Sequence, residues 1–271
     1  QQPNSPHHGR WTLPARLRTA YIFLGFSKSP YYDLELREHI QQTIDESYDI
    51  VFTNPGPLTK LLQPSDKLAV HDYAIKVDLA KHFRPRTSIN SLIHISGEQP
   101  QKDSGRSKQI MELTGLPHEI FPPRKPYSTW DQRMFKLRRW LQRHHLPSPL
   151  FLHPNYVRHS KVIRKYLAYD GFVHIAREVP PYSDGLYTTT LLEAGLLGMI
   201  LFWHDTVGAG NRYETIFDLP LEPEAAAEAI LNIRDSINVE QHSRATSEEI
   251  REKADPEKVT RFRYERITAL L

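Results

Sequence analysis

Short apolar runs alternate with amphipathic segments along most of the chain. The apolar runs are rich in β-branched and aromatic residues and are bounded by turn-forming residues, which is typical of buried strands. They predict strands at residues 18–26, 49–53, 67–70, 91–96, 117–121, 149–153, 171–176, 199–203 and 217–221. The amphipathic segments predict helices at residues 32–47, 58–62, 103–113, 128–145, 157–168, 224–237, 247–253 and 255–271, and one more that begins on the threonines near residue 188. This alternation predicts an α/β fold with a doubly wound parallel sheet, in which ligands bind beyond the carboxyl ends of the strands.

The regular alternation is interrupted between residues 71 and 90, where charged residues and prolines replace the apolar pairs. We interpret this stretch as a linker and place a domain boundary near Thr87. The predicted domains are residues 1–87, a short and incomplete N-terminal α/β portion, and residues 88–271, a Rossmann-like domain. The polar, proline-rich start of the chain predicts a poorly ordered arm.

One stretch combines a turn with a helix start. It reads Val-Pro-Pro-Tyr-Ser-Asp-Gly-Leu-Tyr-Thr-Thr-Thr-Leu-Leu-Glu and ends at Glu193. The first amides of a helix lack partners within the helix, and the helix dipole adds partial positive charge, so such a turn suits a phosphate. Glu193 lies one to two turns into the helix, where a carboxylate can accept hydrogen bonds from a sugar diol. An ordinary strand–turn–helix connection is the alternative interpretation of the same residues.

Composition narrows the possible chemistry. The 271 residues carry 35 Lys and Arg against 32 Asp and Glu, a net charge of +3, which suits a phosphorylated ligand but falls short of a dedicated nucleic-acid binder. The chain contains no cysteine, which excludes disulfides, thiol catalysis and cysteine-ligated metals. The histidines show no metal-ligand spacing with carboxylates, so we expect no metal. Without a signal peptide or a long apolar run, we expect a cytoplasmic protein, with peripheral contact to the inner membrane face left open.

Two further features have two interpretations each. Lys102 follows the predicted strand 91–96 and Gly97, where it can reach a diphosphate on the same rim as the glycine turn; the alternative is a solvated lysine at a helix start. The predicted helix 128–145 carries five cations beside Trp130 and Trp140. Such a helix can touch anionic lipid or nucleic acid, and we favour the alternative of a solvated face with an apolar inner stripe.

Four segments, taken in order, resemble the nucleotide-sugar-binding half of GT-B glycosyltransferases, in the retaining group (group 1, family 4-like) that includes bacterial mannosyltransferases, glycogen synthases and sucrose synthases. The last two are the most extensive: residues 172–198, which end in Leu-Leu-Glu-Ala-Gly-Leu-Leu-Gly, and the strand and loop at residues 199–208. The earlier two are the linker at residues 73–85 and His-Ile-Ser-Gly at residues 94–97 with Lys102. Together they cover roughly the last 200 residues.

The resemblance implies a role for each matching residue. Lys102, after Gly97, would grip the donor diphosphate, and Glu193 would hold the ribose hydroxyls. Asp184 would stand near the transferred sugar. Asp184 and Lys102 would be the catalytic residues. The phosphates would be capped by Gly185 and the backbone amides of Leu186, Tyr187, Thr188 and Thr189. The leaving diphosphate would be stabilised electrostatically, with no cofactor and no metal.

The sequence departs from the family pattern at three points. Gly185 occupies the position of the family's first acid, so that Asp184 is one residue out of register, and Glu98 replaces the usual Arg near the diphosphate. The 87 residues before the boundary match only the final portion of an acceptor-binding domain.

We therefore predict a glycosyltransferase that transfers a hexose from a nucleotide-diphosphate sugar, with retention, to a glycan, lipid or protein acceptor. It would require a missing N-terminal domain or a partner if the chain is inactive alone. The alternative is a non-catalytic glycosyltransferase-like module that binds a nucleotide-sugar or a partner protein. No nucleic acid is expected as a partner.

Overall fold

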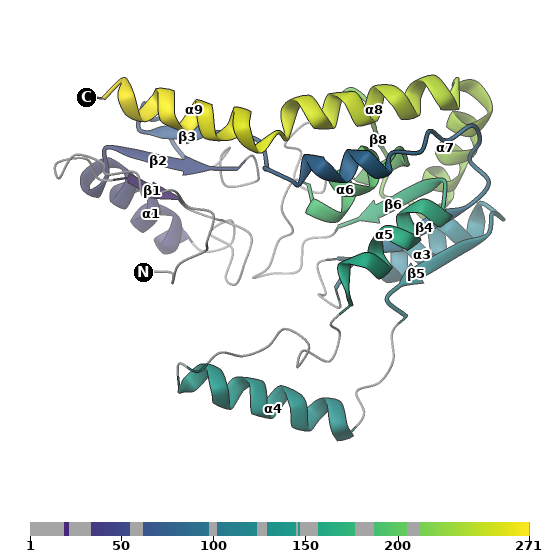
Figure 1. Cartoon of the computed structure of the whole chain (residues 1–271), viewed down its shortest axis with the longest axis horizontal. Coiled ribbons are helices and arrows are strands. Elements are labelled where there is room, and N and C mark those ends of the chain that lie inside the picture. The colour runs from purple at the N-terminus through teal and green to yellow at the C-terminus, as the bar shows by residue number, and fades with distance from the viewer. Residues whose placement is uncertain are drawn as a thin grey trace.

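A computed structural model describes residues 19–21, 34–54, 62–97, 102–123, 129–144, 146, 157–176, 187–204 and 212–270. Within them the strands form two parallel sheets (Figure 1). The first sheet has the order β1-β2-β3 and contains β1 (Thr19–Tyr21), β2 (Ile50–Thr53) and β3 (Leu68–Val70). The second has the order β5-β4-β6-β7-β8 and contains β4 (Leu92–Ile95), β5 (His118–Phe121), β6 (Gly171–Ile175), β7 (Ile200–His204) and β8 (Ile216–Asp218). The predicted α/β class with parallel sheets is confirmed.

Helices cover both faces of the second sheet. One face is packed by α3 (Ser104–Leu113) and α7 (Pro223–Ser236), and the other by α5 (His159–Ala168), α6 (Thr189–Leu196), α8 (Val239–Lys253) and the 3₁₀ helix η1 (Val77–His82). Strand β6 shows why both faces must be covered. Phe172 enters one apolar core and Val173 the other, and every residue of the strand is buried. A continuous apolar run is the pattern expected of a strand that is covered on both sides.

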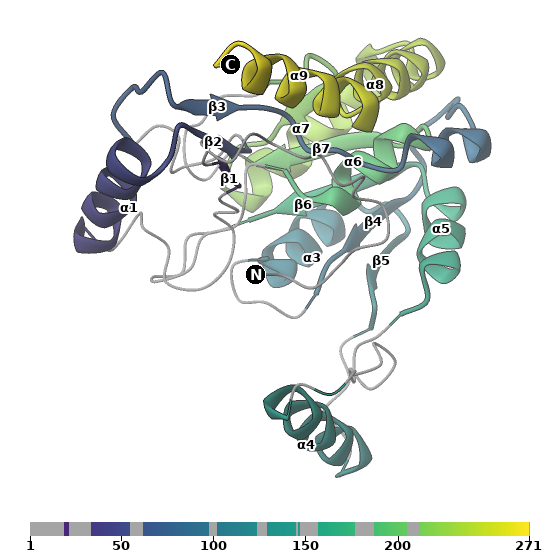
Figure 2. The same ribbon diagram turned by 60° about the vertical axis from the view of Figure 1, so that its left-hand side comes forward.

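The remaining helices have different surroundings. Helix α1 (Leu34–Ser47) packs Ile44 against Val51 of the first sheet. Helix α4 (Thr129–Arg143) stands away from both sheets in Figures 1 and 2. Helix α9 (Pro256–Thr268) returns to the first sheet, where Phe262 and Ile267 pack against β2. No helix in the described part of the chain is both long and apolar enough to cross a membrane.

The boundary predicted near Thr87 falls between the last strand of the first sheet and the first strand of the second. The predicted range 88–271 for the second domain includes α9, which packs on the first sheet. Sequence position alone therefore does not separate the two packing units at the C-terminal end.

Most predicted elements agree with the structure to within a few residues, and two differ. Helix α8 begins at Val239 rather than near residue 247, and Asn238 caps it by accepting a hydrogen bond from the Gln241 amide. The predicted linker contains the 3₁₀ helix η1. The predicted strand at 149–153 and most of the predicted helix at 58–62 and of the predicted strand at 18–26 lie outside the described residues.

Candidate functional site

The order of strands in the second sheet defines where a ligand is expected. From β4 the chain first moves outward to β5 and then crosses to the other side of β4, where it forms β6. The carboxyl ends of β4 and β6 therefore flank the topological switch point, which is the usual binding crevice in sheets of this kind. Because all the strands are parallel, Gly97, Ala176 and His204 lie at this same edge. The predicted alternation of strands and helices led us to expect that Gly97 and the loops at residues 153–156, 176–185 and 204–211 share one rim. This is confirmed for Gly97, Ala176 and His204, whereas residues 153–156, 177–186 and 205–211 lie outside the described ones.

Where β4 and β6 diverge, hydrogen bonds from side chains replace the backbone pairing between the strands. The two strands pair only at Leu92 with Gly171 and at Ile93 with Phe172. Beyond that point His94 Nδ1 lies 2.9 Å from the carbonyl oxygen of Val173 and therefore carries the proton that it donates. The Ile175 amide donates to Ser107 Oγ at 3.2 Å. These bonds give the Val173 carbonyl and the Ile175 amide partners where the two strands separate.

Two buried histidines stack beneath this fork. The rings of His94 and His174 are 5.4 Å apart and nearly parallel, with an interplanar angle of 7°. With Nδ1 protonated, His94 Nε2 accepts a hydrogen bond from Ser96 Oγ at 2.6 Å. His174 is 1% exposed and is therefore a histidine of the core.

Gly97 and Lys102 follow β4 at the rim. A Cβ atom added to Gly97 would meet no atom within 4 Å, so space is open at this position. Lys102 is half-buried and comes immediately before Asp103, which caps α3 by accepting a hydrogen bond from the Arg106 amide at 3.1 Å. The cap fixes the start of α3 and, with it, the position of the Lys102 backbone.

The N-terminus of α6 is directed to the same rim. Thr188 caps the helix, and its hydroxyl accepts a hydrogen bond from the Leu191 amide at 3.2 Å. The Thr188 carbonyl also accepts the amides of Leu191 and Leu192. The amides of Thr189 and Thr190 are thus the first ones without an acceptor inside the helix, which is the arrangement that binds anions.

Tyr187 anchors the start of α6 to the rest of the sheet. Its hydroxyl accepts a hydrogen bond from the Arg212 amide at 2.6 Å, and its ring packs edge-on against Tyr213 at 5.0 Å. The side chain is 3% exposed and also contacts Trp203. The Tyr187 side chain is therefore structural, and the predicted phosphate contact concerns its backbone amide alone.

Glu193 of α6 meets two residues of α5. Its Oε2 atom lies 3.2 Å from Nε2 of His159 and 3.2 Å from the hydroxyl of Tyr166. Burial, and then the charge of Glu193, raise the pKa of Tyr166 well above its usual value. The hydroxyl therefore stays protonated and donates a hydrogen bond to the carboxylate. The Glu193 side chain is 17% exposed and that of His159 is 47% exposed.

The Glu193 contacts are relevant both to a structural role and to a ligand-binding role of this carboxylate. Within the described residues both hydrogen bonds use Oε2, and the second oxygen, Oε1, makes none. The carboxylate is therefore held in one orientation by α5 while half of its accepting capacity is unused. Sequence reasoning missed His159 and Tyr166 as partners, because nothing in the periodicity of α5 indicates which residue of α6 it meets.

The structure describes only some of the remaining predicted residues. Asp184, Gly185 and Leu186, together with Glu98, lie outside the described residues. Thr189 is exposed at the first position of α6. Among the residues that the structure describes, no group of three or more His, Asp or Glu side chains is arranged to hold a metal ion.

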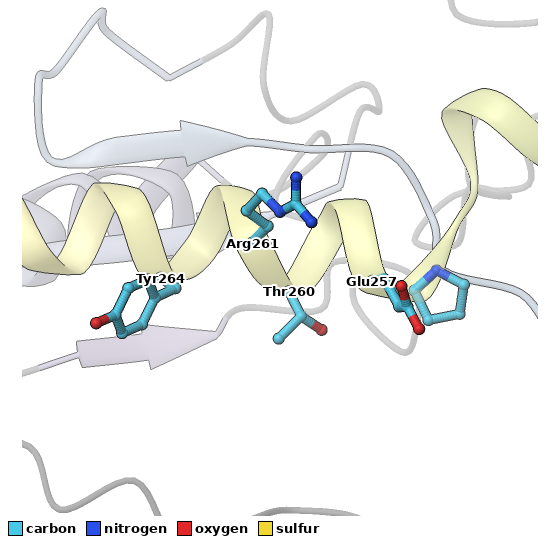
Figure 3. A pocket seen from close by; sticks show the side chains of 5 residues that line it. Glu257, Thr260, Arg261 and Tyr264 are labelled. Carbon is cyan, nitrogen blue, oxygen red and sulfur yellow. The ribbon is translucent and has the colours of Figure 1, made fainter.

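A separate hollow borders α9. Its volume is about 440 Å³, and its described lining comes from α9 alone (Figure 3). The lining residues are Pro256, Glu257, Thr260, Arg261 and Tyr264. None of these residues belongs to the switch point, so the hollow is distinct from the site assembled around α6.

Comparisons with known proteins place this arrangement in context. No family model matches the chain. No curated protein matches it by sequence either. Solved structures do match. Sucrose-phosphate synthase of Thermosynechococcus elongatus is 13% identical with a TM-score of 0.58, and the match covers 93% of this chain and 68% of that one.

Two other solved structures are similar to the same extent. Anabaena HepE in complex with UDP is 12% identical with a TM-score of 0.61, and the match covers 92% of this chain and 72% of that one. A variant of S. aureus TarM in complex with fondaparinux, alpha-GlcNAc-glycerol and UDP is 11% identical with a TM-score of 0.60, with coverage of 91% and 50%. At such low identity the likeness establishes the fold: the chain has the GT-B glycosyltransferase fold.

Proposed function

We propose that the protein is a glycosyltransferase that transfers a hexose, with retention, from a nucleotide-diphosphate sugar bound at the carboxyl edge between β4 and β6. The observation that carries the proposal is the geometry of α6. Its first two amides are without intrahelical acceptors, and Glu193 in its second turn has one unused carboxylate oxygen. The neighbouring fold supports the same ligand class, since Anabaena HepE has been solved with UDP and with UDP-glucose.

The donor diphosphate would lie at the start of α6. The Thr189 and Thr190 amides and the positive end of the helix dipole favour a negative charge there. Lys102, from the rim beyond β4, would add a full positive charge. Glu193 lies four residues beyond Thr189, or about 6 Å along the helix axis. A phosphate at the helix start and a ribose diol at Glu193 therefore match the order of groups in a nucleoside diphosphate.

The roles of the residues follow from charge. Tyr166 and His159 hold Glu193 Oε2, so that Oε1 would accept a hydrogen bond from a ribose hydroxyl. Lys102 and the α6 amides would stabilise the negative charge that develops on the leaving diphosphate, a task that fixed dipoles and charges perform without a metal. In this proposal Asp184 is assigned to the transferred sugar.

Isothermal titration calorimetry with UDP-, GDP- and ADP-sugars tests the proposal. Glu193→Ala should weaken donor binding by about 1.5–3 kcal/mol, the range for a hydrogen bond to a charged group. Glu119→Ala is the matched control, because that carboxylate also accepts two hydrogen bonds at 2.5 Å, from Lys165 of α5 and from Tyr169, which follows this helix. Tyr169 follows the last turn of α5, far from the proposed donor, so the control should bind like the wild type.

The outcomes separate three cases. If none of these nucleotide-sugars binds, the proposal is wrong. If a donor binds equally well to a folded Glu193→Ala variant, the assigned role of this residue is wrong. If a donor binds but is neither hydrolysed nor transferred when glycan and lipid acceptors are supplied, the chain is a non-catalytic nucleotide-sugar-binding module.

A further inference from the structure

Helix α4 presents a surface that the proposed donor site does not use. It follows β5 and stands apart from both sheets in the two views of the molecule (Figures 1 and 2). Helices of globular proteins normally bury an apolar stripe against a neighbouring element. The apolar stripe of α4 is instead left at the surface of the molecule.

The stripe is narrow and contains large side chains. At 100° per residue, Trp130, Met134, Leu137 and Leu141 fall within an arc of about 60°. Trp130 is 64% exposed and Leu137 is 41% exposed. Trp140, on the flank of the stripe, is 51% exposed and packs against the ring of His144 at 4.7 Å. Large apolar groups gathered on one exposed face indicate a surface that is covered in function.

The rest of the helix is cationic. The sequence Thr-Trp-Asp-Gln-Arg-Met-Phe-Lys-Leu-Arg-Arg-Trp-Leu-Gln-Arg contains five cations and a single carboxylate. Within the described residues, four of these cations make no ion pair: Arg133, Lys136, Arg138 and Arg143. Arg133 and Arg138 flank the apolar stripe on opposite sides, as the same rotation of 100° per residue requires. A partner of α4 must therefore combine an apolar layer with negative charge on both sides of it.

We infer that α4 lies in the interfacial plane of an anionic lipid bilayer, with its apolar stripe among the acyl chains and its cations among the headgroups. A short helix with Trp and Leu on one face and Arg and Lys around it has the composition of an interfacial helix. Tryptophan suits this boundary because its ring is apolar and its indole N–H is polar. The position of α4 beyond the carboxyl end of β5 places that edge of the second sheet toward the bilayer.

Other occupants fit the helix less well. A nucleic acid would satisfy the cations but would offer no apolar layer for Trp130, Leu137 and Leu141. A second copy of α4 would cover the stripe but would bring two sets of cations together, and 15 residues provide about two heptads, fewer than a stable coiled coil uses. The bilayer interface satisfies both features at once.

Sedimentation with vesicles tests the inference on the full chain. The wild type should bind vesicles of phosphatidylcholine and phosphatidylglycerol far more tightly than vesicles of phosphatidylcholine alone. Each cation near an anionic surface contributes roughly a fivefold change in partitioning. The triple variant Arg133→Gln, Lys136→Gln, Arg143→Gln should therefore bind the anionic vesicles on the order of 100-fold more weakly.

A matched control separates α4 from net charge. Lys81, Lys108 and Lys258 are 65%, 58% and 58% exposed and lie outside α4, and changing all three to Gln removes the same charge. This control should bind within a few-fold of the wild type. The double variant Trp130→Ser, Trp140→Ser should lose binding while circular dichroism and the melting temperature stay unchanged, because both side chains are exposed.

Three results would overturn the inference. They are a wild type that binds neither vesicle, equal weakening of the two triple variants, and an unaltered Trp130→Ser, Trp140→Ser variant. Binding of the wild type to duplex DNA, or self-association through α4, with no vesicle binding would assign the helix to one of the other occupants.

Discussion

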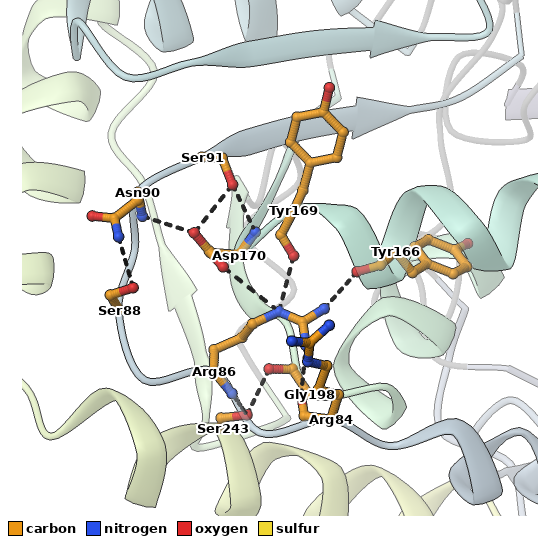
Figure 4. Close-up of polar contacts among 10 residues, drawn as sticks. All are labelled: Arg84, Arg86, Ser88, Asn90, Ser91, Tyr166, Tyr169, Asp170, Gly198 and Ser243. Atoms are coloured by element: carbon orange, nitrogen blue, oxygen red, sulfur yellow. Dashed lines mark hydrogen bonds and ion pairs between the residues drawn. The ribbon is translucent and has the colours of Figure 1, made fainter.

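Arg86 fastens the connection between the two sheets to the second sheet (Figure 4). Its side chain is 5% exposed and donates hydrogen bonds to three carbonyl oxygens: Tyr169 O at 2.9 Å, Arg84 O at 2.6 Å and Tyr166 O at 2.6 Å. Its Nε atom lies 3.8 Å from Asp170 Oδ1. Burial lowers the pKa of Arg86 and Asp170 raises it. Because an arginine pKa lies far above neutrality, the guanidinium stays charged.

Replacing Arg86 with Met removes every one of these bonds while filling most of the volume. Three carbonyls lose a donor in a buried setting, where an unsatisfied group costs about 1–3 kcal/mol. Costs of neighbouring groups are not additive, and removing one partner of a buried ion pair typically costs about 3–5 kcal/mol in all. We expect Arg86→Met to lower the free energy of unfolding by about 3–5 kcal/mol, as for other buried ion pairs.

Urea and thermal denaturation measure this change. A loss of that size should lower the melting temperature by roughly 10 °C in a chain of this length. Arg244→Met is the matched control. Arg244 is 53% exposed, and its one ion-pair partner in the described part of the chain is Glu240, one turn away on α8, so its loss should stay within about 0.5 kcal/mol. An Arg86→Met variant within about 1 kcal/mol of the wild type would refute the account of Arg86 as the anchor of the connection.

Two further predictions concern the packing around the second sheet. Gly198 has a φ of +92°, and a Cβ there would collide with the carbonyl oxygen of Arg84. Gly198→Ala should therefore lower the free energy of unfolding by about 1–3 kcal/mol or more. Gly97→Ala should leave it unchanged, because a Cβ at Gly97 meets no atom, and thermal melting of the two variants tests this difference. Burial lowers the pKa of His242 from 6.5, so the unfolded chain takes up a proton first as the pH falls, and stability should be lost below about pH 6.5. Burial lowers the pKa of His71 as well, so His242→Gln should remove only part of this loss of stability. Urea denaturation at about pH 7.5 and about pH 5.5 measures the loss. A loss in His242→Gln as large as in the wild type would contradict the prediction.

The central strands of the second sheet, β4, β6 and β7, could be predicted from the sequence because they are buried on both faces. Residues 200–203 are fully apolar, and so are most of residues 171–175, which leaves little ambiguity. The first half of α8 could not be read in this way. Its buried positions include Ser243, Thr246 and Ser247, whose hydroxyls donate to carbonyl oxygens of Gly198, His242 and Leu196. A helix that buries hydroxyls instead of apolar groups has no apolar periodicity to detect.

The candidate site was predictable in its placement but not in its partners. Strand order and parallel register bring Gly97 to the edge where α6 begins, as the alternation of elements predicted. The contacts of Glu193 with His159 and Tyr166 depend on how α5 lies beside α6, and this packing leaves no local pattern in the sequence. The assignments of Asp184, Gly185 and Leu186 stay predictions.

The two sheets are joined by two stretches of chain that lie side by side. One stretch leaves β3 and the other connects α8 to α9, and they are hydrogen-bonded to each other through the Ile75 amide and the Ala254 carbonyl at 3.1 Å. His71, which follows β3, accepts a hydrogen bond through Nε2 from Arg263 Nε of α9 at 2.9 Å. A change in the relative orientation of the two sheets must therefore deform both stretches.

This junction is connected to the start of α6 by consecutive contacts. Asp72, which follows β3, lies 3.5 Å from Arg212 on the connection between β7 and β8. The Arg212 amide donates to the hydroxyl of Tyr187 at 2.6 Å, and Tyr187 immediately precedes Thr188, the cap of α6. A rotation of one sheet relative to the other must either break the ion pair between Asp72 and Arg212 or displace Arg212, and the second outcome moves the proposed phosphate site. The orientation of the first sheet and the position of the α6 amides are therefore linked for as long as the ion pair between Asp72 and Arg212 holds.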